Sequence, residues 1–129
     1  MDVLVPLDGS DCSVRALKFA VDLARRFGGS LHVVHFSDHE TDATDQILDR
    51  AEATLDEAGV EDDPELVLRG IEIRDADEVG KEILNLVEKE GYDHVVMGHH
   101  GGGVVDRAIL GSAAQTVVRG ETVPVTVVP

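Results

Sequence analysis

The chain has 129 residues, of which 43% are hydrophobic, and its 26 acidic residues outnumber 11 basic ones to give a formal net charge of −15. This length predicts a single domain over residues 1–129 with an ordinary buried core. The negative charge argues against binding to nucleic acid and to anionic membrane surfaces, because both attract basic proteins.

Other features of the composition favour a cytoplasmic protein. No apolar run approaches the ~20 residues that a transmembrane helix needs, and the first residues lack the basic segment of a signal peptide. The one cysteine, Cys12, has no partner for an internal disulfide. Many acidic residues with only three lysines are typical of halophilic proteins, in which salt screens the repulsion. An ordinary acidic cytosolic protein is the alternative.

Hydrophobic periodicity predicts strands and helices in alternation. Val3–Leu7 is a nearly continuous apolar run, as expected of a strand covered on both faces. Ser10 or Asp11 caps the helix that follows, and glycines from Gly28 onward end it. Leu31–Phe36 predicts the second strand.

The middle of the chain continues this alternation. A polar loop is expected from Ser37 to Thr44, followed by a helical stripe over Ile47–Ala58. Leu66–Ile73 predicts a third strand of mixed polarity, which we expect at an edge of the sheet. Asp77 is a candidate cap for the third helix, and Gly91 its stop.

The last third predicts two more strands and a helix. His94–Met97 is the fourth strand, Ser112–Arg119 the fourth helix, and Val123–Val128 the fifth strand. Pro124 lacks an N–H group, so it favours the end or the edge of a sheet. The whole order predicts a single-domain α/β fold with an open parallel five-stranded sheet and helices on both faces. Periodicity alone does not give the order of the strands within the sheet.

A glycine-rich stretch connects the fourth strand to the fourth helix. Gly98 is followed by three glycines from Gly101, and Gly111-Ser112 opens the helix. Glycine lets main-chain N–H groups approach an anion closely, and a helix N-terminus attracts negative charge. The stretch therefore predicts a phosphate-binding loop, with ordinary turn and cap chemistry as the alternative.

The spacing Gly98-x-x-Gly101, nine residues and Gly111-Ser112 resembles the nucleotide-binding signature of the universal stress protein family, in its ATP-binding branch. The stretch from Asp8 to Leu17 resembles that family's first strand-to-helix turn, and the resemblance covers Val3 to Val128. It implies a Rossmann-like fold of the adenine nucleotide alpha hydrolase type, with strand order 3-2-1-4-5. Strands one and four would then lie side by side at the switch point where open sheets bind ligands.

The resemblance also implies an ATP site, with or without Mg²⁺. Its expected residues come from the two turns and from the end of the second strand: Pro6, Leu7, Asp8, Phe36, Met97, Gly98, His100, Gly101, Gly111, Ser112 and Ala113.

Two positions depart from the family's pattern. Gly102 stands where related proteins often carry a basic residue, a loss that Arg107 would compensate. Phe36 stands where a smaller aliphatic residue is usual, so it either packs against the base or fills the core. The histidines are not spaced like the ligands of a tetrahedral metal site, and we expect no bound transition metal.

These features favour a nucleotide-responsive regulatory or protective module in a stress response. The resemblance implies a homodimer that pairs through the Val123–Val128 strand. One alternative is a dimeric interaction protein of the same fold that binds no nucleotide. The other alternative is a slow Mg²⁺-dependent ATPase. Its hydrolysis would be slow because the sequence contains no Walker loop and no catalytic triad order, and we assign no catalytic residue.

Overall fold

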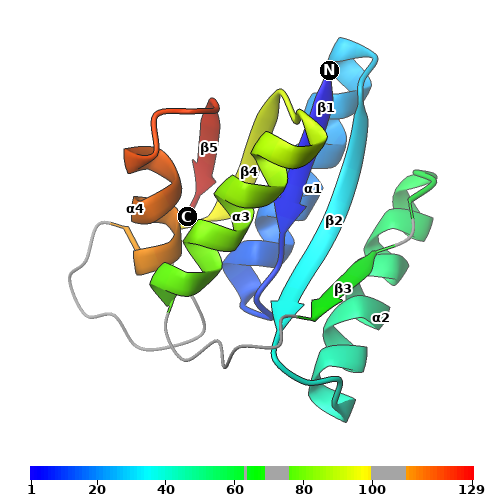
Figure 1. The fold of residues 1–129 in the computed structure, drawn as a ribbon. Helices are drawn as coiled ribbons and strands as arrows, with labels where there is room; N and C mark the ends of the chain where they lie inside the picture. The colour runs from blue at the N-terminus through cyan, green and yellow to red at the C-terminus, as the bar shows by residue number, and fades with distance from the viewer. Residues whose placement is uncertain (63, 69–75, 100–109) are drawn as a thin grey trace.

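The computed structural model describes residues 1–62, 64–68, 76–99 and 110–129, and within them strands and helices alternate as expected (Figure 1). The strands are β1 (Asp2–Pro6), β2 (Ser30–Ser37), β3 (Glu65–Leu68), β4 (His94–Gly98) and β5 (Val125–Val128). The helices are α1 (Asp11–Phe27), α2 (Asp42–Ala58), α3 (Ala76–Glu90) and α4 (Ser112–Arg119). All strand pairs are parallel and the order is β3-β2-β1-β4-β5, which confirms the α/β fold and the order 3-2-1-4-5.

Two hydrophobic clusters, one on each face of the sheet, form the core. The central strand β1 contributes to both, since Val3 and Val5 belong to the cluster under α1 and α2, and Leu4 to the cluster under α3 and α4. All three side chains are fully buried. Burying an aliphatic side chain contributes roughly 1.5–3 kcal/mol, so the alternation of β1 explains its uninterrupted apolar sequence.

The second helix begins earlier than the sequence predicts. The polar loop expected up to Thr44 is wrong in its last residues, because α2 begins at Asp42. The Thr44 N–H group donates to Thr41 Oγ1 at 3.2 Å, and the Thr41 N–H group donates to Thr44 Oγ1 at 2.8 Å. This reciprocal capping satisfies two backbone donors at the start of the helix, which the apolar stripe alone does not reveal.

The two edge strands lie where the sequence predicts them. β3 and β5 are the outer strands of the sheet. β3 is described only to Leu68, and the remainder of the strand expected up to Ile73 lies outside the described residues. β5 begins after Pro124, whose carbonyl oxygen accepts from the Val95 N–H group at 3.0 Å.

Close contact between α3 and α4 fixes the position of the last helix. A Cβ atom at Gly80 would lie 2.5 Å from the Cβ atom of Thr116, so only glycine lets α3 approach α4 this closely. The start of α4, which carries Ser112, is thereby held at the carboxyl edge of the sheet. In the part of the chain that is described, no helix is long and apolar enough to cross a membrane.

A histidine between two carboxylates fastens the α2–β3 connection to β2. The Nδ1 atom of His32 lies 3.1 Å from Asp62 Oδ1, and its Nε2 atom lies 3.0 Å from Glu65 Oε2. Asp62 also accepts from the Val33 N–H group at 2.9 Å, and the ring of Tyr92 stacks on His32. Burial lowers the pKa of His32, but the hydrogen bonds and charges of Glu65 and Asp62 raise it more, so the pKa lies above its usual 6.5.

This raised pKa predicts that the histidine stabilises the fold at low pH. The contribution is complete below the unfolded pKa of about 6.5 and is lost as pH rises through the higher folded pKa. We expect His32→Gln to lower the free energy of unfolding by about 1 kcal/mol near pH 5.5 and by less near pH 8.5. Urea unfolding at both pH values measures this, with His39→Gln on the exposed loop as the control. An equal loss at both pH values would show that the charge of His32 plays no part.

Candidate functional site

The turns after β1 and β4 leave the same edge of the sheet. β1 pairs with β4 through Val3 and His94 and through Leu4 and Val95, and it pairs with β2 on its other side. The chain crosses from β1 to β2 in one direction and continues to β4 and β5 in the other, so the strand order reverses between β1 and β4. Ligands of open α/β sheets bind beyond the carboxyl ends of the strands at this switch point.

Asp8 shapes the turn between β1 and α1. Its Oδ1 atom accepts from the Ser10 N–H group at 2.8 Å and from the Ser10 hydroxyl at 2.5 Å. The Ser10 hydroxyl oxygen in turn accepts from the Ser13 N–H group at 3.2 Å and caps α1. Asp8 itself is exposed, so its carboxylate is accessible to a ligand while it orders the turn.

The other residues expected from β1 and β2 are buried beneath this turn. Pro6 and Leu7 are buried, and the Leu7 N–H group donates to the Val34 carbonyl at 2.8 Å. The side chain of Phe36 lies in the core cluster that also contains Met97. The ring therefore fills core at the end of β2, which is one of the two roles considered for it.

Gly98 at the end of β4 lies against the first turn of α1. A Cβ atom there would lie 2.6 Å from Cys12 Sγ and 3.0 Å from the Ser13 nitrogen. The first glycine of the signature is thus required by packing, whether or not a ligand is bound. Sequence reasoning missed this contact, because nothing in the spacing of the motifs indicates that Cys12 faces Gly98. The same contact holds the Asp8 turn beside the end of β4.

The start of α4 presents main-chain donors at the same edge. Gly111 is the N-cap in extended conformation, and no side chain of the described residues caps the helix. The Gly111 N–H group donates to the His99 carbonyl, and the His99 N–H group donates to the Val128 carbonyl at 2.9 Å. N–H groups in the first turn of a helix have no intrahelical partner, and they lie at its positive end. Ser112 is exposed there and Ala113 is half-buried.

Two of the expected site residues, His100 and Gly101, lie outside the described residues. The structure brings together the rest of the two motifs, from Asp8, Gly98 and Gly111 to Ser112, at one edge of the sheet. Among the residues that are described, no group of three histidine, cysteine or acidic side chains is arranged to hold a metal ion. The arrangement offers main-chain donors, a hydroxyl and a carboxylate, which suit binding of a phosphorylated ligand.

The packing of Gly98 predicts a loss of stability on substitution that does not depend on a ligand. Gly98→Ala places a methyl group against Cys12 and the backbone of α1, and overpacking of this kind costs about 1–3 kcal/mol. Urea unfolding of ligand-free protein measures the loss. Adding Cys12→Ala, which removes the nearest atom, should restore part of it. A fully stable Gly98→Ala variant would mean that α1 does not pack on β4 this closely.

Comparison with known proteins agrees with this geometry. The chain is 26% identical to universal stress protein MJ0531 of Methanocaldococcus jannaschii, over 98% of this chain and 80% of that protein. A universal stress protein structure from Archaeoglobus fulgidus superposes with a TM-score of 0.80 at 25% identity, covering 100% of this chain and 98% of that one.

A structure of the A. fulgidus universal stress protein in complex with dAMP has a TM-score of 0.76 at 24% identity, with the same coverage of 100% and 98%. The model of the universal stress protein family matches residues 1–129. The chain belongs to the universal stress protein family.

Proposed function

We propose that this protein binds an adenine nucleotide, ATP in the first place, between the Asp8 turn and the 98–112 stretch. In this proposal it acts as a nucleotide-responsive regulatory or protective module in a stress response. The observation that carries the proposal is the N-terminus of α4, which no described side chain caps and which follows β4, the neighbour of β1 at the switch point. The dAMP complex of the A. fulgidus relative supports the choice of an adenine nucleotide.

Charge assigns the two ends of the ligand to different parts of the site. The phosphates would bind the first-turn N–H groups of α4 at Ser112 and Ala113, with the Ser112 hydroxyl as a further donor. The Asp8 carboxylate repels phosphate, so without a bridging Mg²⁺ it would instead accept a hydrogen bond from a ribose hydroxyl. The base would then lie near the end of β2, where Phe36 offers main-chain groups.

The remaining expected residues complete this site in the proposal. Pro6, Leu7 and Met97 form its apolar floor, and Gly98 lets the ligand approach the end of β4. His100 and Gly101 would supply the part of the loop between Gly98 and Gly111. Because no residue is placed as a general base, we propose binding rather than rapid hydrolysis.

The regulatory effect would be a shift between two conformations. A nucleotide can favour one conformation only if it binds that conformation more tightly than the other. His99 links β5 to the start of α4, because its N–H group donates to the Val128 carbonyl and its carbonyl accepts from the Gly111 N–H group. Ligand binding there would change the surface next to the edge strand, which a partner protein can recognise.

A second candidate, an interaction module that binds no nucleotide, also has support. Phe36 fills core and the contact with Cys12 explains Gly98 without a ligand. Both candidate functions have support, so a nucleotide-binding experiment has to distinguish them.

The nucleotide proposal predicts that freshly purified protein carries ATP. Mass spectrometry of the denatured sample should detect it, and Gly111→Val should remove it by placing a side chain at the start of α4. Ser112→Ala, which leaves the fold intact, should weaken ATP binding about tenfold through loss of one hydroxyl contact.

Thr122→Ala, at an exposed position after α4, is the control and should bind like the wild type. If no variant carries nucleotide, and added MgATP does not bind in molar KCl, the interaction module is the correct function.

We further propose a homodimer that pairs along the outer edge of β5, within the predicted Val123–Val128 strand. The Pro124 and Val128 carbonyls accept from Val95 of β4 and from His99 directly after it, so the alternation of the strand directs the main-chain groups of Val125 and Val127 outward. An uncovered edge of this kind is a template for pairing with a second strand.

Light scattering is expected to give twice the mass of one chain at both low and high salt. Val127→Pro removes a donor from the outer edge and leaves the β4 ladder intact, so it should give monomers. Val127→Ala retains the donor and should remain dimeric. A monomeric wild type at both salt concentrations would exclude the dimer.

A further inference from the structure

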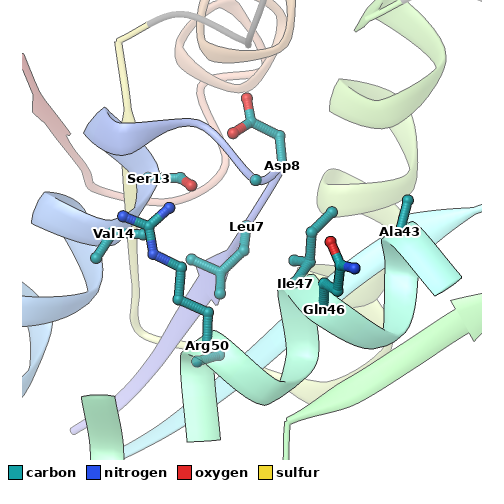
Figure 2. Close-up of a pocket in the computed structure, with 10 residues that line it drawn as sticks. Leu7, Asp8, Ser13, Val14, Ala43, Gln46, Ile47 and Arg50 are labelled. Atoms are coloured by element: carbon teal, nitrogen blue, oxygen red, sulfur yellow. The ribbon is translucent and has the colours of Figure 1, made fainter. Parts of the chain in front are cut away.

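A cavity of about 410 Å³ lies between α1 and α2, next to the turn after β1 (Figure 2). Its volume is within the range of small-molecule sites. Among the described residues, those that line it come from the β1–α1 turn, α1 and α2, and none comes from β4 or α4. The cavity therefore lies apart from the proposed phosphate-binding groups of α4, although Leu7 and Asp8 belong to both regions.

Most of the wall is apolar. Leu7 and Ala51 are buried in the core cluster, and Val14 and Ile47 flank them from the two helices. Gly9 has φ +87°, and a Cβ atom there would lie 3.0 Å from Ile47 Cδ1, so the turn packs directly on α2 and closes one side. These walls suit the apolar body of a small organic molecule.

One cation borders this apolar space. Arg50 is the only basic residue among the described ones that line the cavity, in a chain of net charge −15. Figure 2 shows its side chain extending from α2 toward Ser13 and Val14 of α1, while the Asp8 carboxylate points away from it. Asp8 therefore does not neutralise the guanidinium from within the cavity.

The present partner of Arg50 is easily replaced. Its Nη2 atom lies 3.3 Å from Asp11 Oδ1, and the two side chains are 52% and 80% exposed. Exposed pairs of this kind contribute little to stability. A planar guanidinium can bind a carboxylate with two parallel hydrogen bonds, so a ligand carboxylate competes well with a single long contact.

We propose that this cavity binds a small organic anion with an apolar body, of the class of aromatic or short aliphatic carboxylates. The ligand carboxylate binds Arg50, and its apolar part packs on Leu7, Val14 and Ile47. Gln46 also lines the cavity, beside Ile47 and away from the guanidinium of Arg50 (Figure 2).

The test uses phenylacetate as the probe and phenylacetamide as its neutral match. Amide chemical shifts of nucleotide-free protein are followed during titration, and phenylacetate should move the signals of Gly9, Val14 and Ile47. Phenylacetamide should bind about tenfold more weakly, because it lacks the charge that Arg50 recognises. No binding of phenylacetate at about 20 mM, or equal binding of both probes, would overturn the proposal.

Two variants locate the binding within the cavity. Arg50→Gln should weaken phenylacetate binding about tenfold, whereas Arg26→Gln, an exposed arginine at the end of α1, should not change it. Val14→Phe should fill the cavity and block binding while retaining Arg50. Ser112→Ala should bind phenylacetate like the wild type, so failure of the nucleotide proposal leaves this result unaffected. Unchanged binding by Arg50→Gln and Val14→Phe would place the probe elsewhere.

Discussion

The contact between the end of β4 and the first turn of α1 determines the geometry of the whole carboxyl edge. Gly98 lies so close to Cys12 that no larger residue fits. This contact fixes the capped turn of Asp8 and Ser10 beside the end of β4, where the strand order reverses. Two segments that are about ninety residues apart in sequence therefore share one small region.

The same turn separates two environments of different chemistry. On one side lie the start of α4, which no described side chain caps, and the exposed carboxylate of Asp8. On the other side, Gly9 packs on Ile47 and encloses an apolar cavity with Arg50 at its border. A strongly acidic protein has few places that attract an anion, so a helix N-terminus and an arginine paired only with an exposed carboxylate are the features that matter.

Much of the fold follows from local sequence. The apolar run of β1 requires a strand covered on both faces, and Gly28, in the left-handed conformation, ends α1 as expected. The start of α2 was not predicted, because a capping pair of two threonines has no hydrophobic signal. The order of the strands came from the resemblance and not from periodicity, since pairing between strands is decided by contacts distant in sequence.

By itself the sequence determined the succession of strands and helices, the position of both edge strands and the two motifs that follow β1 and β4. Tertiary structure decided what these residues touch. Only packing shows that Gly98 is needed against Cys12, that Phe36 fills core and that His32 bridges Asp62 and Glu65. The physical reason is that periodicity reports which face of an element is buried, whereas the partner of a side chain depends on how the elements pack together.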